Sequence, residues 1–103
     1  MMDRLEALKQ LVAQNPGDSF ARYGLATEYA RAGQVAEAVA EFQALVEAHP
    51  DYAAAYQQGG QALERLGRIE EARQFYRRGI AVTTSQGNAH ARDQLQAALD
   101  LLA

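Results

Sequence analysis

The chain has 103 residues, no cysteine and a formal net charge of −3 at pH 7. This length suits one domain with a modest core, and the absence of cysteine excludes disulfides, thiolate metal sites and cysteine nucleophiles. The negative charge disfavours nucleic acid and acidic membranes as partners, because both require clustered positive charge.

The N-terminal segment predicts a helix over about residues 3–14. Asp3 followed by Glu6 resembles a capping box, and apolar residues then recur at helical spacing, at Leu5, Leu8, Leu11 and Val12. The segment lacks the basic start and continuous apolar run of a signal peptide, and no apolar run elsewhere approaches membrane-spanning length. We therefore expect a soluble cytoplasmic protein.

Two further helices are predicted before Pro50. Asp18 is a candidate cap for a helix over about 19–32, which Gly33 can end in the left-handed conformation. An apolar stripe from Val35 to Val46 predicts the next helix. That helix ends at His49, because a residue before proline is driven away from helical geometry.

The same order of cap, helix, glycine stop and second helix is repeated after Pro50. Asp51 is the candidate cap of a helix over about 52–66, which Gly67 closes, and another helix follows over about 69–83. Gly59 lies inside the first of these two helices and is expected to cost about 1 kcal/mol relative to alanine. Residues 83–88 predict a polar turn, and a last amphipathic helix is marked by Ala91, Leu95, Ala98, Leu99 and Leu102.

One sequence segment occurs twice in nearly the same form. Residues 31–42 read RAGQVAEAVAEF, and residues 65–76 read RLGRIEEARQFY. The matching residues lie 34 positions apart (65 − 31 = 34), as do the two prolines at positions 16 and 50. A fixed period of this length indicates stacked helical hairpins.

The repeat resembles the tetratricopeptide repeat. Residues at that family's characteristic positions are Leu25, Ala26, Tyr29, Ala38, Phe42 and Pro50 in the first repeat and Gly60, Leu63, Ala72 and Tyr76 in the second. Arg22 replaces an aromatic residue that Tyr56 retains, Gly59 replaces a leucine, and Thr84 stands where the first repeat has Pro50. The resemblance implies an all-α, right-handed superhelical stack of about six antiparallel helices, a tetratricopeptide-like α-solenoid.

The domain organisation follows from this alignment. We expect a single domain over residues 1–103, with a half-repeat helix over 1–17, repeats over 19–52 and 53–86, and a capping helix over 88–103. Terminal half-repeats of this kind cover the exposed faces of the stacked hairpins.

The resemblance also selects candidate binding residues, because the first helix of each hairpin in this family faces a concave groove. Side chains three and four residues apart share a helical face. The resulting set is Phe20, Tyr23, Thr27 and Ala30, then Ala54, Gln57, Gln61 and Glu64. Such a wall suits an extended peptide or a helix. Alternatively, Phe20 and Tyr23 simply pack under the first predicted helix.

The sequence offers little for other chemistry. The family's carboxylate clamp needs lysine or arginine on the inner face, and Arg92 on the last helix is the one nearby cation. No constellation of nucleophile, base and acid is apparent, the two histidines lack metal-ligand spacing, and no cofactor motif occurs. We expect no enzyme activity, catalytic residue, metal or cofactor.

The predicted function is a protein-protein interaction module, an adaptor or scaffold that binds a peptide or helix of a partner protein in the groove. The alternative is a structural module that dimerises through its terminal helices, because Leu99, Leu101 and Leu102 cannot all face one inner neighbour. The expected state is a monomer or weak homodimer.

Overall fold

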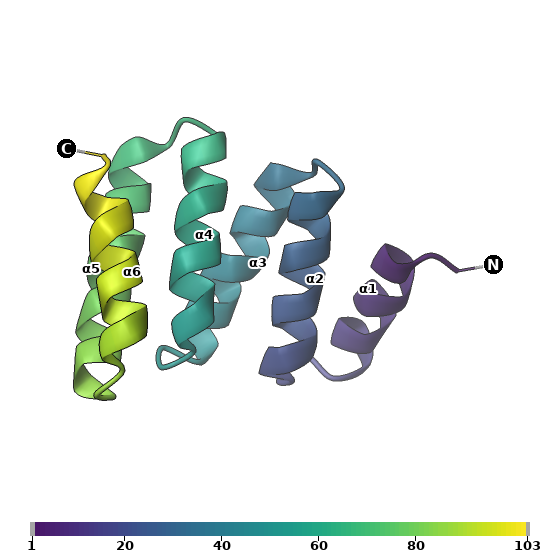
Figure 1. The fold of residues 1–103 in the computed structure, drawn as a ribbon. Coiled ribbons are helices and arrows are strands. Elements are labelled where there is room, and N and C mark those ends of the chain that lie inside the picture. Colours follow the sequence, from purple (N-terminus) through teal and green to yellow (C-terminus); the bar gives the residue numbers. More distant parts are fainter. Residues whose placement is uncertain (1, 103) are drawn as a thin grey trace.

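The computed structural model describes residues 2–102 and contains six α-helices in that range. Consecutive helices run antiparallel and stack side by side, with the N-terminus and C-terminus at opposite ends (Figure 1). The prediction of an all-α helical repeat is confirmed. The six helices are α1 (Arg4–Gln14), α2 (Ser19–Arg31), α3 (Val35–Ala48), α4 (Ala53–Arg65), α5 (Ile69–Ser85) and α6 (Ala89–Asp100).

The hairpins divide the helices into two kinds. α2 with α3 and α4 with α5 form the two complete hairpins, so we call α2, α4 and α6 first helices and α1, α3 and α5 second helices. In Figure 1 the first helices α2, α4 and α6 lie on the near side and α3 and α5 lie behind them. The two kinds of helix therefore form the two faces of the stack.

Local signals set most helix boundaries. The carboxylate of Asp3 accepts a hydrogen bond from the Glu6 backbone N–H at 2.8 Å, and Asp18 accepts one from Ala21 at 3.1 Å. Gly33 and Gly67 end α2 and α4 with φ of 82° and 75°, as the sequence predicts, because glycine has no Cβ penalty in this conformation.

Two boundary predictions were wrong. Asp51 does not cap α4, because the helix begins at Ala53 and its N-cap is Tyr52, which makes no side-chain cap bond. α5 continues to Ser85 instead of ending near residue 83, and the stop is supplied by Gly87 with φ of 70°. α6 accordingly occupies Ala89–Asp100 within the predicted segment 88–103.

The core is continuous along the stack. Its main cluster spans α2 to α6 and includes the fully buried Phe42, Tyr56, Leu63 and Tyr76. A smaller cluster of Val12, Ala21 and Leu25 joins α1 to α2. Two small residues, Ala38 of α3 and Ala72 of α5, are completely buried in the main cluster.

Gly59 corrects another prediction. A Cβ built at residue 59 would lie 2.8 Å from Cδ2 of Phe75 and 3.1 Å from Cβ of Phe42. α4 therefore carries a glycine at this position because the Phe75 ring fills the space of a side chain. The helix-propensity cost of glycine is offset by the burial of Phe75, so alanine is not the better residue.

None of the helices in residues 2–102 is both long and apolar enough to cross a membrane.

Candidate protein-binding surface

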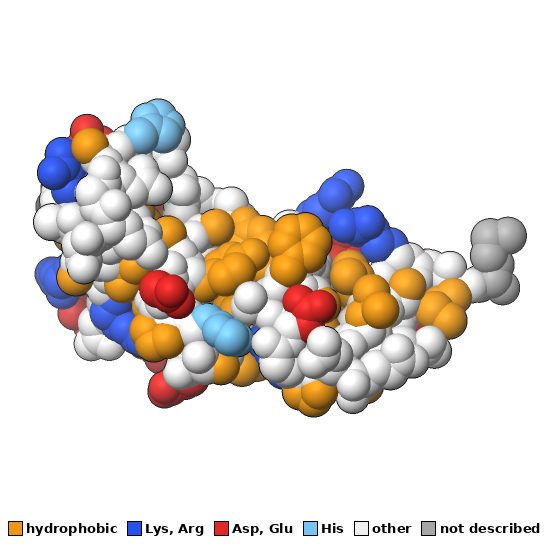
Figure 2. Space-filling view, turned by 90° about the horizontal axis from the view of Figure 1, so that it is seen from below, with side chains coloured by type: hydrophobic (Ala, Val, Ile, Leu, Met, Phe, Trp, Pro, Cys, Tyr) orange, Lys and Arg blue, Asp and Glu red, His pale blue; other side chains and the backbone are white. Residues whose placement is uncertain are grey.

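The first helices line a hollowed side of the molecule. Figure 2 views the molecule from the end where the α1–α2, α3–α4 and α5–α6 turns lie, and its outline is hollowed along the side of the first helices. Hydrophobic side chains gather across the middle of this view, with charged side chains around them. The N-terminal ends of α2 and α4 lie at this end of the molecule, and they carry Phe20, Tyr23 and Tyr52.

A groove of about 340 Å³ opens between α1 and α2. Phe20 stands at its edge with 78% of its surface exposed, and Leu11 of α1 is 52% exposed. These values are high for large apolar side chains, which are usually covered. We call this the α1–α2 groove, and its lining residues are Arg4, Leu8, Leu11, Asp18, Phe20, Ala21, Tyr23, Gly24, Thr27, Glu28 and Arg31.

The repeat explains why Leu11 is exposed. Leu11 corresponds to Leu45, which lies 34 residues later on α3 and is 0% exposed. Leu45 is covered because α2 packs against α3, whereas α1 makes extensive contacts with α2 alone among the described helices. The groove is therefore a position in the stack where one helical neighbour is missing from residues 2–102.

Phe20, Tyr23 and Thr27 share this groove, but their roles differ. Tyr23 is half-buried and packs on Phe42 and Tyr52, with ring centroids 6.1 and 5.4 Å away. The Thr27 hydroxyl donates to the Tyr23 carbonyl oxygen at 2.8 Å, so its proton is already used. The alternative of burial under α1 fails for Phe20, whose ring faces solvent, and Tyr23 packs mainly toward α3 and the start of α4.

The α4 residues of the predicted wall lie outside the α1–α2 groove. Gln57 and Gln61 occupy the positions on α4 that Tyr23 and Thr27 occupy on α2, with Gln57 half-buried and Gln61 exposed. Glu64 is engaged inside the protein, because its carboxylate accepts a hydrogen bond from the Tyr76 hydroxyl. Burial, and next the Glu64 carboxylate, raise the pKa of Tyr76 well above its ordinary value.

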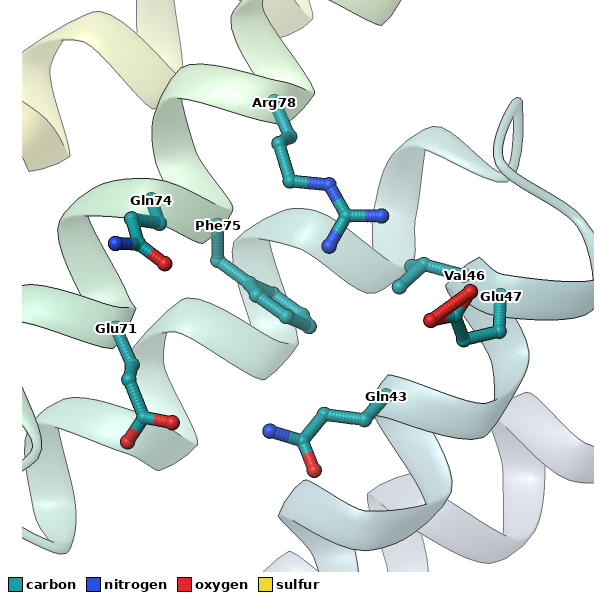
Figure 3. Close-up of a pocket in the computed structure, with 7 residues that line it drawn as sticks. All are labelled: Gln43, Val46, Glu47, Glu71, Gln74, Phe75 and Arg78. Atoms are coloured by element: carbon teal, nitrogen blue, oxygen red, sulfur yellow. The ribbon is translucent and has the colours of Figure 1, made fainter.

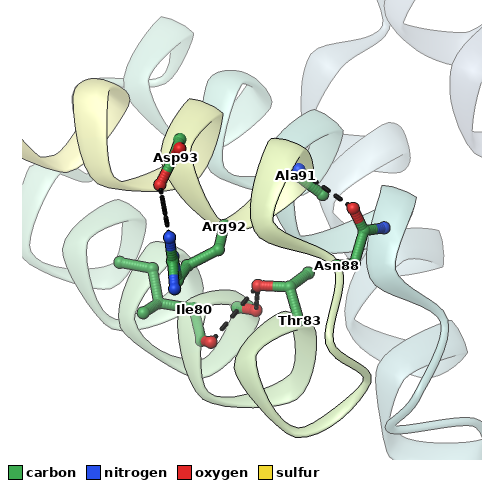
Figure 4. A network of polar contacts seen from close by, with 7 residues as sticks. Ile80, Thr83, Asn88, Ala91, Arg92 and Asp93 are labelled. Atoms are coloured by element: carbon green, nitrogen blue, oxygen red, sulfur yellow. Dashed lines mark hydrogen bonds and ion pairs between the residues drawn. The ribbon is translucent and has the colours of Figure 1, made fainter.

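Arg92 lies apart from the groove, on α6. Its guanidinium pairs with the neighbouring Asp93 at 3.0 Å, and Figure 4 shows it beside Ile80 of α5. The same view shows the Thr83 hydroxyl beside Ile80. This buried hydroxyl donates to the carbonyl oxygens of Gly79 and Ile80. The structure therefore does not bring Arg92 together with Phe20, Tyr23 and Thr27.

A second cavity of about 300 Å³ lies between α3 and α5. Figure 3 shows Phe75 at its centre, with Gln43, Glu71, Gln74 and Arg78 around it. The Arg78 guanidinium lies 5.7 Å from the Phe75 ring centre, and the ring is only 5% exposed. This cavity offers less apolar surface to a partner than the α1–α2 groove does. Within residues 2–102, no three His, Asp or Glu side chains are placed to hold a metal ion.

Sequence reasoning missed the contribution of α1. The sequence marks Leu5, Leu8, Leu11 and Val12 only as the apolar stripe of a helix, whereas in the structure Leu8 and Leu11 line the groove. Their 34-residue counterparts Phe42 and Leu45 need α2 as a cover, so the comparison of repeats contains the missing signal.

The stack of paired helices with an open apolar groove defines an all-α helical-repeat protein. The sequence profile of the tetratricopeptide repeat matches residues 5–53 and 23–89, and the chain belongs to this family. Tetratricopeptide repeats generally mediate interactions between proteins, and proteins of this family are generally non-catalytic.

Individual relatives agree with this assignment. A TPR repeat-containing protein of Pseudomonas aeruginosa is 29% identical over 91 residues, which cover 88% of this chain and 87% of the relative. A tetratricopeptide repeat domain protein of Salinibacter ruber, solved by NMR, is 36% identical with a TM-score of 0.80, covering 85% of this chain and 89% of that one. The solution structure of a Bordetella parapertussis protein is 28% identical with a TM-score of 0.83 and covers 99% of this chain and 89% of its own.

Proposed function

We propose that this protein is an interaction module that binds a segment of a partner protein on the side of the first helices, with the α1–α2 groove as the main anchor. The observation that carries the proposal is the exposure of Phe20 and Leu11 on either side of an apolar groove. Exposed aromatic and aliphatic side chains beside a cavity are typical anchors of protein interfaces.

The groove favours an apolar side chain with polar flanks. Leu8, Leu11 and Gly24 supply apolar walls, and charged residues of both signs stand at the rim, with Arg4, Arg31, Asp18 and Glu28. The formal charges of these four residues sum to zero, so the groove does not select strongly acidic or strongly basic segments. A segment that leaves the groove along the first helices would next meet the amides of Gln57 and Gln61, which can donate to and accept from a peptide backbone.

The proposal is tested by capturing partners from an extract of the source cells and then titrating an identified partner by calorimetry. Phe20→Ala should weaken binding, because the ring is an exposed anchor. Arg77→Ala on α5 is the matched control, since its side chain is 58% exposed and distant from the groove. Equal affinity of wild type and Phe20→Ala would remove the α1–α2 groove from the binding site.

A further inference from the structure

The α1–α2 groove has an occupied equivalent within the same chain. The first helix α2 packs against the second helix α3 and also contacts the next first helix, α4. The pair α3 and α4 therefore forms the surface against which the first helix α2 packs. α1 and α2 are likewise a second helix followed by a first helix, and their groove is open. The repeat therefore specifies a helix of the first kind as the shape that fits.

α6 is a first helix with a free side. It packs extensively against α5, and no second helix follows it within the described residues. Counting from the N-caps Asp18, Tyr52 and Asn88 identifies the residues that face the following second helix in each hairpin. The positions four, eight and eleven residues after the cap are Arg22, Ala26 and Tyr29 on α2, Tyr56, Gly60 and Leu63 on α4, and Arg92, Gln96 and Leu99 on α6.

Contacts within the hairpins support this assignment. Arg22 binds Glu41 of α3 at 2.6 Å, and a Cβ built at Gly60 would lie 2.7 Å from Cζ of Tyr76 on α5. On α6, Gln96 is exposed, Arg92 lies beside Ile80 of α5, and Leu99 is half-buried against the core. No second helix within residues 2–102 covers this side of α6, so part of the pairing side of a first helix, with Gln96, faces solvent.

From this pairing we infer that the protein assembles head to tail, with α6 of one copy seated in the α1–α2 groove of a second copy. The two helices would form a hairpin like α4 with α5. One chain cannot make this contact with itself, because α1 and α6 stand at opposite ends of a molecule 43 Å long (Figure 1). This inference goes beyond the proposed partner binding, although a partner segment and α6 would compete for the same groove.

Side-chain volumes match across the proposed contact. Gly60 and Ala26 are small because the opposing second helices carry bulky rings, Tyr76 and Phe42. α1 has Leu8 at that position, and Leu8 is smaller than either ring. The larger Gln96 of α6 therefore meets a smaller opposing residue, which keeps the packing close to that of the hairpins.

Charges match as well. In an antiparallel hairpin the end of the first helix lies beside the start of the second, so Asp100 at the end of α6 would meet Arg4 at the start of α1. Arg31 in the last turn of α2 stands at the same end of the groove. The Arg4 side chain is 69% exposed although it binds Glu28, so a second carboxylate can approach it. Opposite charges at one end set the direction in which α6 lies.

Sedimentation velocity over a range from micromolar to millimolar protein tests the inference with variants of each end. The groove variants are Leu11→Glu and Phe20→Glu, and the helix variant combines Gln96→Lys with Asp100→Lys. Phe20→Glu guards against loss of folding, because the Phe20 side chain is exposed and its replacement disturbs little of the core. The matched controls are Leu66→Glu, at an exposed leucine outside both surfaces, and Gln94→Lys on another side of α6.

Wild type and controls should grow in mass with concentration beyond two chains, because a head-to-tail contact leaves a free end on every oligomer. Each variant alone should remain monomeric. A mixture of a groove variant with the helix variant should form a dimer and stop, since it contains one intact groove and one intact α6.

Three results would overturn the inference: a wild type that stays monomeric at millimolar concentration, a mixture that stays monomeric, or a helix variant that still self-associates. The last would indicate a symmetric contact between two α1–α2 surfaces. The helix variant keeps its groove, so calorimetry with a partner on this variant tests the proposed function separately.

Discussion

Gly60 of α4 lies directly under the ring of Tyr76 on α5, and a Cβ at residue 60 would come within 2.7 Å of the ring's Cζ. Real Cβ atoms do not approach other heavy atoms this closely, so a side chain here must displace a fully buried tyrosine. The two residues fix the distance between the helices of the second hairpin.

We therefore expect Gly60→Ala to lower the free energy of unfolding by about 1–3 kcal/mol through overpacking, despite the higher helix propensity of alanine. Gly24→Ala is the matched control, because its Cβ would meet only the end of the Leu8 side chain, at 3.3 Å, beside the open groove. Urea denaturation of both variants measures the difference. A Gly60→Ala protein as stable as Gly24→Ala would show that α4 and α5 can move apart at little cost.

Ala38→Leu and Ala72→Leu should each destabilise the fold by roughly 1–3 kcal/mol, because both alanines are completely buried in the core and a larger side chain overpacks it. Ala36→Leu, at an exposed position of α3, controls for the added apolar surface. Chemical denaturation midpoints provide the measurement, and midpoints unchanged from wild type would contradict the tight packing of the core around these two alanines.

The Tyr76–Glu64 pair should make stability depend on alkaline pH. Burial and the Glu64 carboxylate raise the pKa of Tyr76 in the folded protein, whereas an unfolded tyrosine ionises near pH 10, at about its model value. Below pH 10 both states keep the proton, and the stabilising effect is fully present. Above pH 10 only the unfolded state loses its proton, so the free energy of unfolding falls as pH rises.

Tyr76→Phe should remove this residue's share of the alkaline loss, and at neutral pH it should cost about 1 kcal/mol because Glu64 loses its donor. Denaturation of wild type and variant between pH 8 and about pH 11, above the ordinary tyrosine pKa, checks both effects. Tyr52 and Tyr56, whose pKa values burial also raises, leave a residual pH dependence in the variant. Identical alkaline slopes in the two proteins would place the loss on those residues instead.

Much of the fold could be predicted because its signals can be read within the sequence itself. The glycine stops and the Asp3 and Asp18 caps each depend on a few neighbouring residues, and the 34-residue period appears when the sequence is compared with itself. The end of α5 could not be placed as well, since Thr84 and Ser85 are polar and turn-like in isolation but extend a helix that packs on both α4 and α6. Gly59 was misjudged because its reason is Phe75, sixteen residues away (75 − 59 = 16) on another helix.

The candidate site could be predicted only in part. Phe20, Tyr23 and Thr27 do share a groove, because one helix face carries all three. The contribution of Leu8 and Leu11 depends on which helix is absent beside α1, which no spacing within α1 reveals. The sequence placed Glu64 in the predicted binding wall as a charged residue. Its hydrogen bond with the Tyr76 hydroxyl becomes visible only when α4 and α5 are placed together.

Partner binding should depend weakly on salt. The groove rim carries two cations and two anions, and exposed charges are screened at high ionic strength, so little net attraction is lost. Phe20→Ala should weaken binding by about 1–2 kcal/mol at both low and high salt. It is a cleaner probe than Tyr23→Ala, because Tyr23 also packs on Phe42 and Tyr52. Calorimetry at two salt concentrations gives the result, and a steep loss of affinity with salt would assign the binding to charged residues elsewhere.

The helices differ in how many of their residues are buried, and this difference sets the order in which they unfold locally. α1 and α6 each bury a single residue, Val12 and Leu95, whereas α3 and α5 each bury five. In a linear stack each helix is held by its neighbours alone, so amide hydrogens in the end helices α1 and α6 should exchange with solvent first and those in the centre last. Anything that occupies the α1–α2 groove covers the fraying α1 end, and slower exchange in α1 then reports occupancy without a label on either molecule.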